Sequence, residues 1–143
     1  MKAFSTAITL FTFLFTGCST IYFVKNSSVE SILASGAEAH LNRFRIEGYA
    51  VSAFEHRVLY SSLKNAQEQK SEKGIWLGGG GLHGSFDPFG RTTKINKVKV
   101  EGTILSQKTW MHEEVGGFGH MGVCNAEIVD LIILEEALVS ESQ

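Results

Sequence analysis

The side chains best suited to chemistry gather around two glycine-rich segments, residues 78–84 and 116–122. His83 lies in the first segment, His120 in the second, and His112 shortly before the second. Three imidazoles around one open position could bind zinc, as a catalytic or a structural ion. Their spacing matches no compact zinc motif, in which two histidines lie four residues apart, and His120 could instead bond a backbone carbonyl and fix its loop. We therefore expect no cofactor and keep a metal site at these histidines as an alternative.

Both segments also contain the pattern G-x-G-x-x-G, which in dinucleotide-binding proteins joins a strand to a helix. The first match runs into residues 85–90, which include Pro88 and end in a glycine and do not suit a helix. The second match precedes a β-branched segment, and neither match is followed by Gly-Lys-Ser or Gly-Lys-Thr. These glycines are therefore predicted to form loops and turns rather than a nucleotide site.

The sequence contains no known motif of a catalytic nucleophile. No serine stands in G-x-S-x-G, and Cys124 has no catalytic signature around it. Glu113 and Glu114 could act as an acid and a base only if the fold placed them in a cleft, whereas adjacent acids in a loop are usually solvated. We therefore predict a protein that is not an enzyme.

Several aromatic residues fall in or near the glycine-rich segments instead of at alternating strand positions. Exposed rings on flexible loops can dock a ligand or a partner. The alternative is that these rings close the ends of a small core. The first interpretation gives a candidate binding surface made of Phe86, Phe89, Trp110, Phe118 and His120.

The N-terminal residues carry a pattern of export. Lys2 precedes an uncharged apolar run, residues 3–15, which is followed by small residues, as in a secretory signal. Residues 14–18, Leu-Phe-Thr-Gly-Cys, resemble the lipobox of bacterial lipoproteins. This resemblance implies cleavage before Cys18, a lipid on its sulfur and attachment to a membrane. Ser19 after the cysteine implies the outer membrane, with the protein facing the periplasm.

Two other interpretations of the N-terminus stay open. The first is an uncleaved membrane anchor, since residues 3–24 contain no charge and about twenty apolar residues can span a bilayer. The second is a cleaved signal without a lipid. In the lipoprotein interpretation Cys124 has no partner, and we expect it to be a small buried residue rather than a reactive thiol. The expected organisation is a signal at 1–17, a tether at 18–28 and one domain at 29–143.

Charge argues against a nucleic-acid partner. The chain has 13 Lys and Arg against 15 Asp and Glu, a formal net charge of −2, whereas nucleic-acid binding proteins usually gather a basic excess on one face. Arg91, Lys94, Lys97 and Lys99 are close in the sequence, but acids in the C-terminal part of the chain offset them. We predict a solvated charged edge at these residues.

The domain is predicted to be mainly β with one or two short helices. Residues 44–50, 56–61, 74–77 and 97–105 have the composition or the alternation of strands, while 127–138 fits a strand or a helix. A helical turn capped by Ser27 or Ser28 is expected at 29–34, and the polar segment 62–73 suits a helix. Gly48 and Gly102 lie inside long strands, where a glycine suits a bulge or a sharp bend. Strongly bent strands predict a small closed barrel of about five strands.

This pattern resembles the OB-fold, a five-stranded barrel, in which residues 98–105 would be the fourth strand. An OB-fold normally has its helix after the third strand, whereas the polar segment here follows the second. The domain is also similar to uncharacterised bacterial envelope proteins, through Val58-Leu59-Tyr60, Trp76 and residues 119–122, and this similarity implies no particular activity.

These observations favour a membrane-tethered, non-catalytic lipoprotein that binds a protein, a peptide or a glycan of the cell envelope. A lipoprotein that binds a metal or a small ligand through His83, His112 and His120 is the alternative. An enzyme that acts on envelope polymers is the second alternative, and it would need a pair of carboxylates in a cleft.

Overall fold

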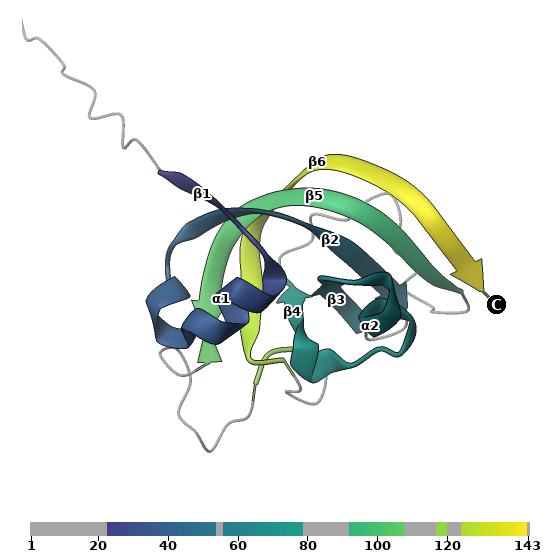
Figure 1. Cartoon of the computed structure of the whole chain (residues 1–143), viewed down its shortest axis with the longest axis horizontal. Coiled ribbons are helices and arrows are strands. Elements are labelled where there is room, and N and C mark those ends of the chain that lie inside the picture. Colours follow the sequence, from purple (N-terminus) through teal and green to yellow (C-terminus); the bar gives the residue numbers. More distant parts are fainter. Residues whose placement is uncertain (1–22, 54–55, 79–91, 108–116, 120–123, 143) are drawn as a thin grey trace, which may run out of the picture.

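The computed structural model describes residues 23–53, 56–78, 92–107, 117–119 and 124–142. This part of the chain is mainly β, with a closed five-stranded barrel and short helices (Figure 1), as the sequence predicts. Its elements in chain order are β1 (Val24–Ser27), α1 (Val29–Ser35), η1 (Gly36–Ala39), β2 (Arg43–Ala53), β3 (His56–Tyr60), α2 (Leu63–Gln67), η2 (Ser71–Lys73), β4 (Gly74–Leu77), β5 (Thr93–Ser106) and β6 (Ala126–Ser142).

The order of the strands closes the barrel. The sheet runs β1-β2-β3-β4-β6-β5, and β2 pairs again with β5, so that β2 to β6 form a ring with β1 outside it. Within the ring, β4 and β6 are parallel and the other neighbours are antiparallel. This is an OB-like barrel. The segment that fitted either a strand or a helix is part of β6, and β5 and β6 arch side by side over the molecule (Figure 1).

The two predicted strand glycines lie where strands approach closely. A Cβ on Gly102 would be 2.6 Å from Cγ1 of Ile128 and 2.7 Å from the carbonyl oxygen of Val129. The pairing of β5 with β6 changes register between Glu101 and Thr103, which marks a bulge at this glycine. A Cβ on Gly48 would be 2.5 Å from the carbonyl oxygen of Tyr60. Both positions therefore need glycine for the strands to bend and close.

The barrel interior is an apolar core that α1 covers at one end. The alternation of 44–50 and 97–105 is confirmed, since every second residue is buried on both long strands: Phe44, Ile46, Gly48 and Ala50 on β2, and Val98, Val100, Gly102 and Ile104 on β5. From α1, Val29 and Ile32 pack into the same core. Ser28 caps the helix, since its Oγ accepts a hydrogen bond from the backbone N–H of Ser31 (3.2 Å). The predicted capped turn is confirmed.

A second apolar cluster lies on the outer side of β2, β3 and β4. Val51 pairs with Val58, and Val58 pairs with Trp76, so that one row of side chains crosses the three strands. Ala66 and Leu63 of α2 pack on this row, and Figure 1 shows α2 beside β3. The helix thus follows the second strand of the barrel, as the sequence predicts and unlike the usual OB-fold.

The expected boundary between tether and domain is wrong. The sequence places residues 24–27 in the tether, but they form β1, which pairs in parallel with β2 from Val24↔Arg43 to Ser27↔Ile46. The backbone of this segment therefore adds a strand to the sheet. The folded domain therefore begins at residue 24, and a tether that starts at residue 18 is shorter than the predicted 18–28.

Candidate functional site

Most of the residues singled out from the sequence lie outside the described residues. This holds for all three candidate metal ligands, and for four of the five members of the aromatic binding surface: His83, His112, His120, Phe86, Phe89 and Trp110. Among the described residues there is no group of three or more His, Cys, Asp and Glu side chains that could hold a metal ion. The prediction for each of these residues stays a prediction.

Phe118 is the candidate that the structure does describe, and it is a core residue. Only 3% of its surface is exposed, and it packs in the second apolar cluster. Its backbone pairs with Cys124 through two hydrogen bonds of 2.7 and 3.1 Å. Next to it, Gly119 has φ +81°, and a Cβ there would overlap the indole of Trp76. The expectation of an exposed ring is therefore corrected for Phe118, because its ring fills the space over β3 and β4.

Cys124 is buried in the same cluster, as predicted. Its Sγ donates a hydrogen bond to the carbonyl oxygen of Ser71 (3.4 Å). Burial raises the pKa of the thiol to about 12, so that almost none of it is thiolate at neutral pH. The residue thus behaves as a small apolar side chain that contacts η2.

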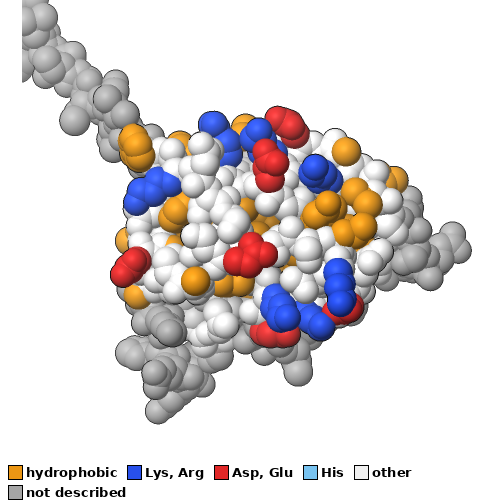
Figure 2. All heavy atoms as spheres, viewed as in Figure 1, with side chains coloured by type: hydrophobic (Ala, Val, Ile, Leu, Met, Phe, Trp, Pro, Cys, Tyr) orange, Lys and Arg blue, Asp and Glu red, His pale blue; other side chains and the backbone are white. Residues whose placement is uncertain are grey.

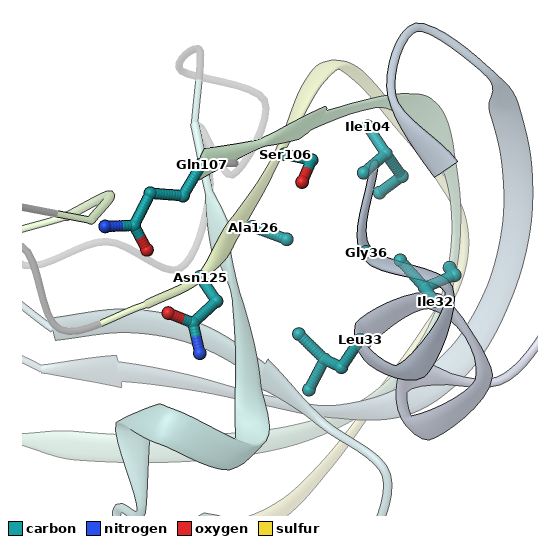
Figure 3. Close-up of a pocket in the computed structure, with 8 residues that line it drawn as sticks. All are labelled: Ile32, Leu33, Gly36, Ile104, Ser106, Gln107, Asn125 and Ala126. Carbon is teal, nitrogen blue, oxygen red and sulfur yellow. The ribbon is translucent and has the colours of Figure 1, made fainter. Parts of the chain in front are cut away.

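A pocket of about 170 Å³ opens where α1 meets the adjoining ends of β5 and β6 (Figure 3). Its apolar wall comes from Ile32 and Leu33 of α1, Ile104 of β5 and Ala126 of β6. Its remaining lining residues are Gly36, Ser106, Gln107 and Asn125. In Figure 3 the amide side chains of Gln107 and Asn125 lie on the side opposite Ile32 and Gly36. The pocket is therefore apolar on one side and carries amide groups on the other.

Hydrogen bonds donated by backbone N–H groups hold the polar side of this pocket in place. The N–H of Gln107 donates to the carbonyl oxygen of Asn125 (3.0 Å), which continues the pairing of β5 with β6 by one residue. The N–H of Ser106 donates to Nδ1 of His40 (3.1 Å). Both amide side chains thus stand on a fixed backbone at the start and at the end of the segment that connects β5 to β6.

The chemistry available in this pocket is binding. Its lining residues contain no ionisable side chain, so that none of them can act as a general acid, a general base or a charged metal ligand. Carboxamide groups can donate and accept hydrogen bonds. A cavity of about 150 Å³ with apolar walls accepts a group of the size of benzene. The pocket therefore suits an uncharged group of that size with a polar edge.

Sequence reasoning missed this pocket because its walls come from distant segments of the chain: Leu33 is 71 residues from Ile104 and 92 residues from Asn125. A weak signal was present. Gln107 and Asn125 are the polar residues that immediately flank β5 and β6 on either side of a long connection, and in OB-folds the connection between the fourth and fifth strands commonly contributes to ligand binding.

The polar outer face of β2, β5 and β6 carries ion pairs that occupy several of its basic side chains. Glu101 accepts from Nε of Arg43 (2.9 Å) and from Nη2 of Arg45 (3.0 Å), and these hydrogen bonds lower the pKa of its carboxyl group. Lys99 lies between Glu47 (3.2 Å) and Glu135 (3.4 Å), which raise the pKa of its ammonium group. This face is a mixed array of both signs, the arrangement expected of a solvated charged sheet.

Comparisons with known proteins place the chain in no class. No protein-family model, no curated protein and no solved structure matches it. Among the described residues, no helix is long and apolar enough to cross a membrane.

Proposed function

We propose that the chain is an envelope lipoprotein, anchored by a lipid on Cys18, whose barrel binds a partner and catalyses no reaction. The lipobox-like residues 14–18 carry the anchor. They stand directly before the fold, since β1 begins at Val24. Ser19 after the lipidated cysteine supports an anchor in the outer membrane, with the barrel in the periplasm.

The pocket between α1 and the ends of β5 and β6 supports the binding function. A peptide of an envelope protein could insert one apolar side chain between Ile32 and Ala126, while its backbone bonds the amides of Gln107 and Asn125. The outer face of β3 and β4, where OB-folds commonly bind their ligands, is covered here by α2 and Phe118. Binding is therefore expected at the pocket and at the β5–β6 connection beside it.

The intact mass of protein extracted from membranes tests the anchor. We expect a chain that begins at Cys18 and carries acyl groups, and Cys18→Ser should abolish the acylation and leave the precursor uncut. An uncut, unmodified mass for the chain with its native Cys18 would contradict the proposal.

Filling the pocket tests the binding site. Ala126 is 4% exposed and lines the pocket, whereas Ala137 is exposed on the same strand. With a photo-crosslinking residue at Gln107, Ala126→Leu should abolish the crosslink to an envelope protein in intact cells, and Ala137→Leu should leave it unchanged. Equal crosslinking in both variants would show that the pocket is not used.

The same pocket supports a second candidate, a lipoprotein that binds a small uncharged ligand, because its volume of about 170 Å³ is that of a small molecule or a single side chain. In that case the crosslinked species adds a small mass rather than a protein. Extraction of the purified protein with organic solvent, followed by mass spectrometry, would identify such a ligand.

A further inference from the structure

The end of the barrel from which β1 starts exposes apolar side chains beside basic ones. Phe23 is 78% exposed and Leu41 is 65% exposed, the highest values among the large hydrophobic residues that the structure describes. Together with Lys25 and Arg43 they border one shallow depression of about 430 Å³. Figure 2 shows hydrophobic side chains beside Lys and Arg side chains at this end of the molecule.

Leu41 is held in its exposed position by a rigid backbone. Its φ of 59° is a conformation that residues other than glycine seldom adopt. Its N–H donates to the carbonyl oxygen of Ile104 (2.8 Å), and the carbonyl oxygen of Asn42 accepts from the N–H of Ile104 (3.0 Å). Ile104 is fully buried in the barrel. The leucine side chain is therefore presented outward by a strained turn that is attached to the core, and such strain is most often found at functional positions.

The charges around these two side chains favour an anionic surface. Lys25 is exposed, and Arg43 and Arg45 share the single carboxylate of Glu101. Asp130 borders the depression as well. The ionisable residues that line the depression are thus two cations, Lys25 and Arg43, and one acid, Asp130, whereas the whole chain has a formal net charge of −2.

We infer that this end of the barrel, with Phe23, Leu41 and Lys25 at its centre, lies against the surface of the phospholipid bilayer. The inference rests on the proposed lipid anchor. Only residues 19–22 separate Cys18 from Phe23, and five steps along an extended chain reach about 18 Å at most. An anchor this short keeps Phe23 within reach of the lipid headgroups.

The size of the patch favours a membrane over a protein partner or a second copy of this chain. A stable protein interface needs about 800 Å² on each side, far more than two exposed side chains supply. A surface that is already tethered to the membrane needs only a weak contact, because the tether keeps its effective concentration high. Apolar side chains at the headgroup boundary, with basic residues next to them, are the usual composition of such a contact.

A fluorescent probe at Leu41 tests the inference on the full chain in vesicles of phosphatidylethanolamine and phosphatidylglycerol. Leu41→Cys supplies the attachment point, since Cys124 is buried. Leu138→Cys is the matched control, because Leu138 is 60% exposed but lies on β6 near the C-terminal end of the strand. Phe23→Cys gives a second test position, on the residue that directly precedes β1. Intact mass spectrometry of the labelled protein shows how many probes are attached and whether Cys18 is acylated in the same sample.

We expect vesicles with brominated acyl chains to quench the probe at Leu41 and at Phe23 about twofold or more, because such residues enter the boundary between headgroups and acyl chains. The probe at Leu138 should keep its intensity. No quenching at either test position, or equal quenching at all three, overturns the inference. A mass without acyl groups overturns the proposed anchor instead, so that the two failures are told apart.

Discussion

Replacing Gly102 by alanine is expected to destabilise the barrel at the bulge of β5. The new Cβ would lie 2.6 Å from Cγ1 of Ile128 and 2.7 Å from the carbonyl oxygen of Val129. Ile128 is fully buried, and the carbonyl belongs to the backbone of β6, so that neither atom can move aside without shifting the strand. Overpacking of this kind costs about 1–3 kcal/mol. Restricting the unfolded chain returns about 0.4–1 kcal/mol, which leaves a net loss of about 1–2 kcal/mol.

Denaturation of the purified chain by guanidinium chloride measures this loss, as a lower midpoint at unchanged slope. Gly78→Ala is the matched control. The three atoms nearest to a Cβ at Gly78 all belong to the flexible side chain of Glu127, whereas Gly102 faces the backbone and a buried side chain, and Gly78→Ala should therefore cost less stability than Gly102→Ala. If Gly102→Ala were as stable as this control, β5 and β6 would not approach each other as closely as described, and the account of barrel closure would be wrong.

Three further predictions concern the core and two buried groups. Ile32 is 1% exposed and Leu138 is 60% exposed. Ile32→Ala should therefore lower the free energy of unfolding by about 2–5 kcal/mol, because it removes a buried side chain. Leu138→Ala should change it by less than about 0.5 kcal/mol. Burial lowers the pKa of His56 below its usual 6.5. The unfolded chain therefore binds a proton more readily than the folded one, and thermal stability should decrease as the pH falls through 6.5, less steeply in His56→Gln. Cys124, with its pKa raised from 9.0 to about 12, should react with a thiol reagent about a thousandfold more slowly in the native protein than in urea; equal rates would show that the thiol is accessible.

The sequence predicted those strands in which the pattern of apolar and polar side chains indicates which residues are buried. Residues 74–77 are bounded by glycines and form β4 with the expected limits. On β5, alternation identified the inward positions, but the strand begins at Thr93, four residues before the expected start at 97. Lys94 and Asn96 look like loop residues in the sequence. They belong to β5 because Lys94 pairs with Glu141 and Asn96 pairs with Leu138 across the ladder, and a single sequence does not show its cross-strand partners.

The same limit explains why β1 and β6 were harder to assign. The segment 24–27 is short and mostly polar, and it forms a strand because it can pair with the edge of β2. On β6, the Glu-Glu-Ala-Leu run beginning at Glu135 has good helix propensity, but it continues the pairing with β5. In both cases the neighbouring strand overrides the local preference. The burial of Cys124 could be predicted from the sequence, since a lone cysteine next to an apolar residue, here Val123, is usually buried.

The two proposed surfaces share one strand, and this constrains what the pocket can bind. Thr103 borders the depression next to Leu41, while its neighbour Ile104 points to the other side of β5 and lines the pocket. The backbone of Ile104 is also the group that holds Leu41 in its exposed position. If Leu41 lies at the bilayer, the pocket stands one sheet's thickness from the membrane surface. The partner would then be met close to the membrane, as a membrane-proximal segment of an envelope protein would be. A soluble partner that bound the pocket equally well in detergent and on vesicles would argue against this arrangement, and a partner that crosslinks to Gln107 only in membranes would support it.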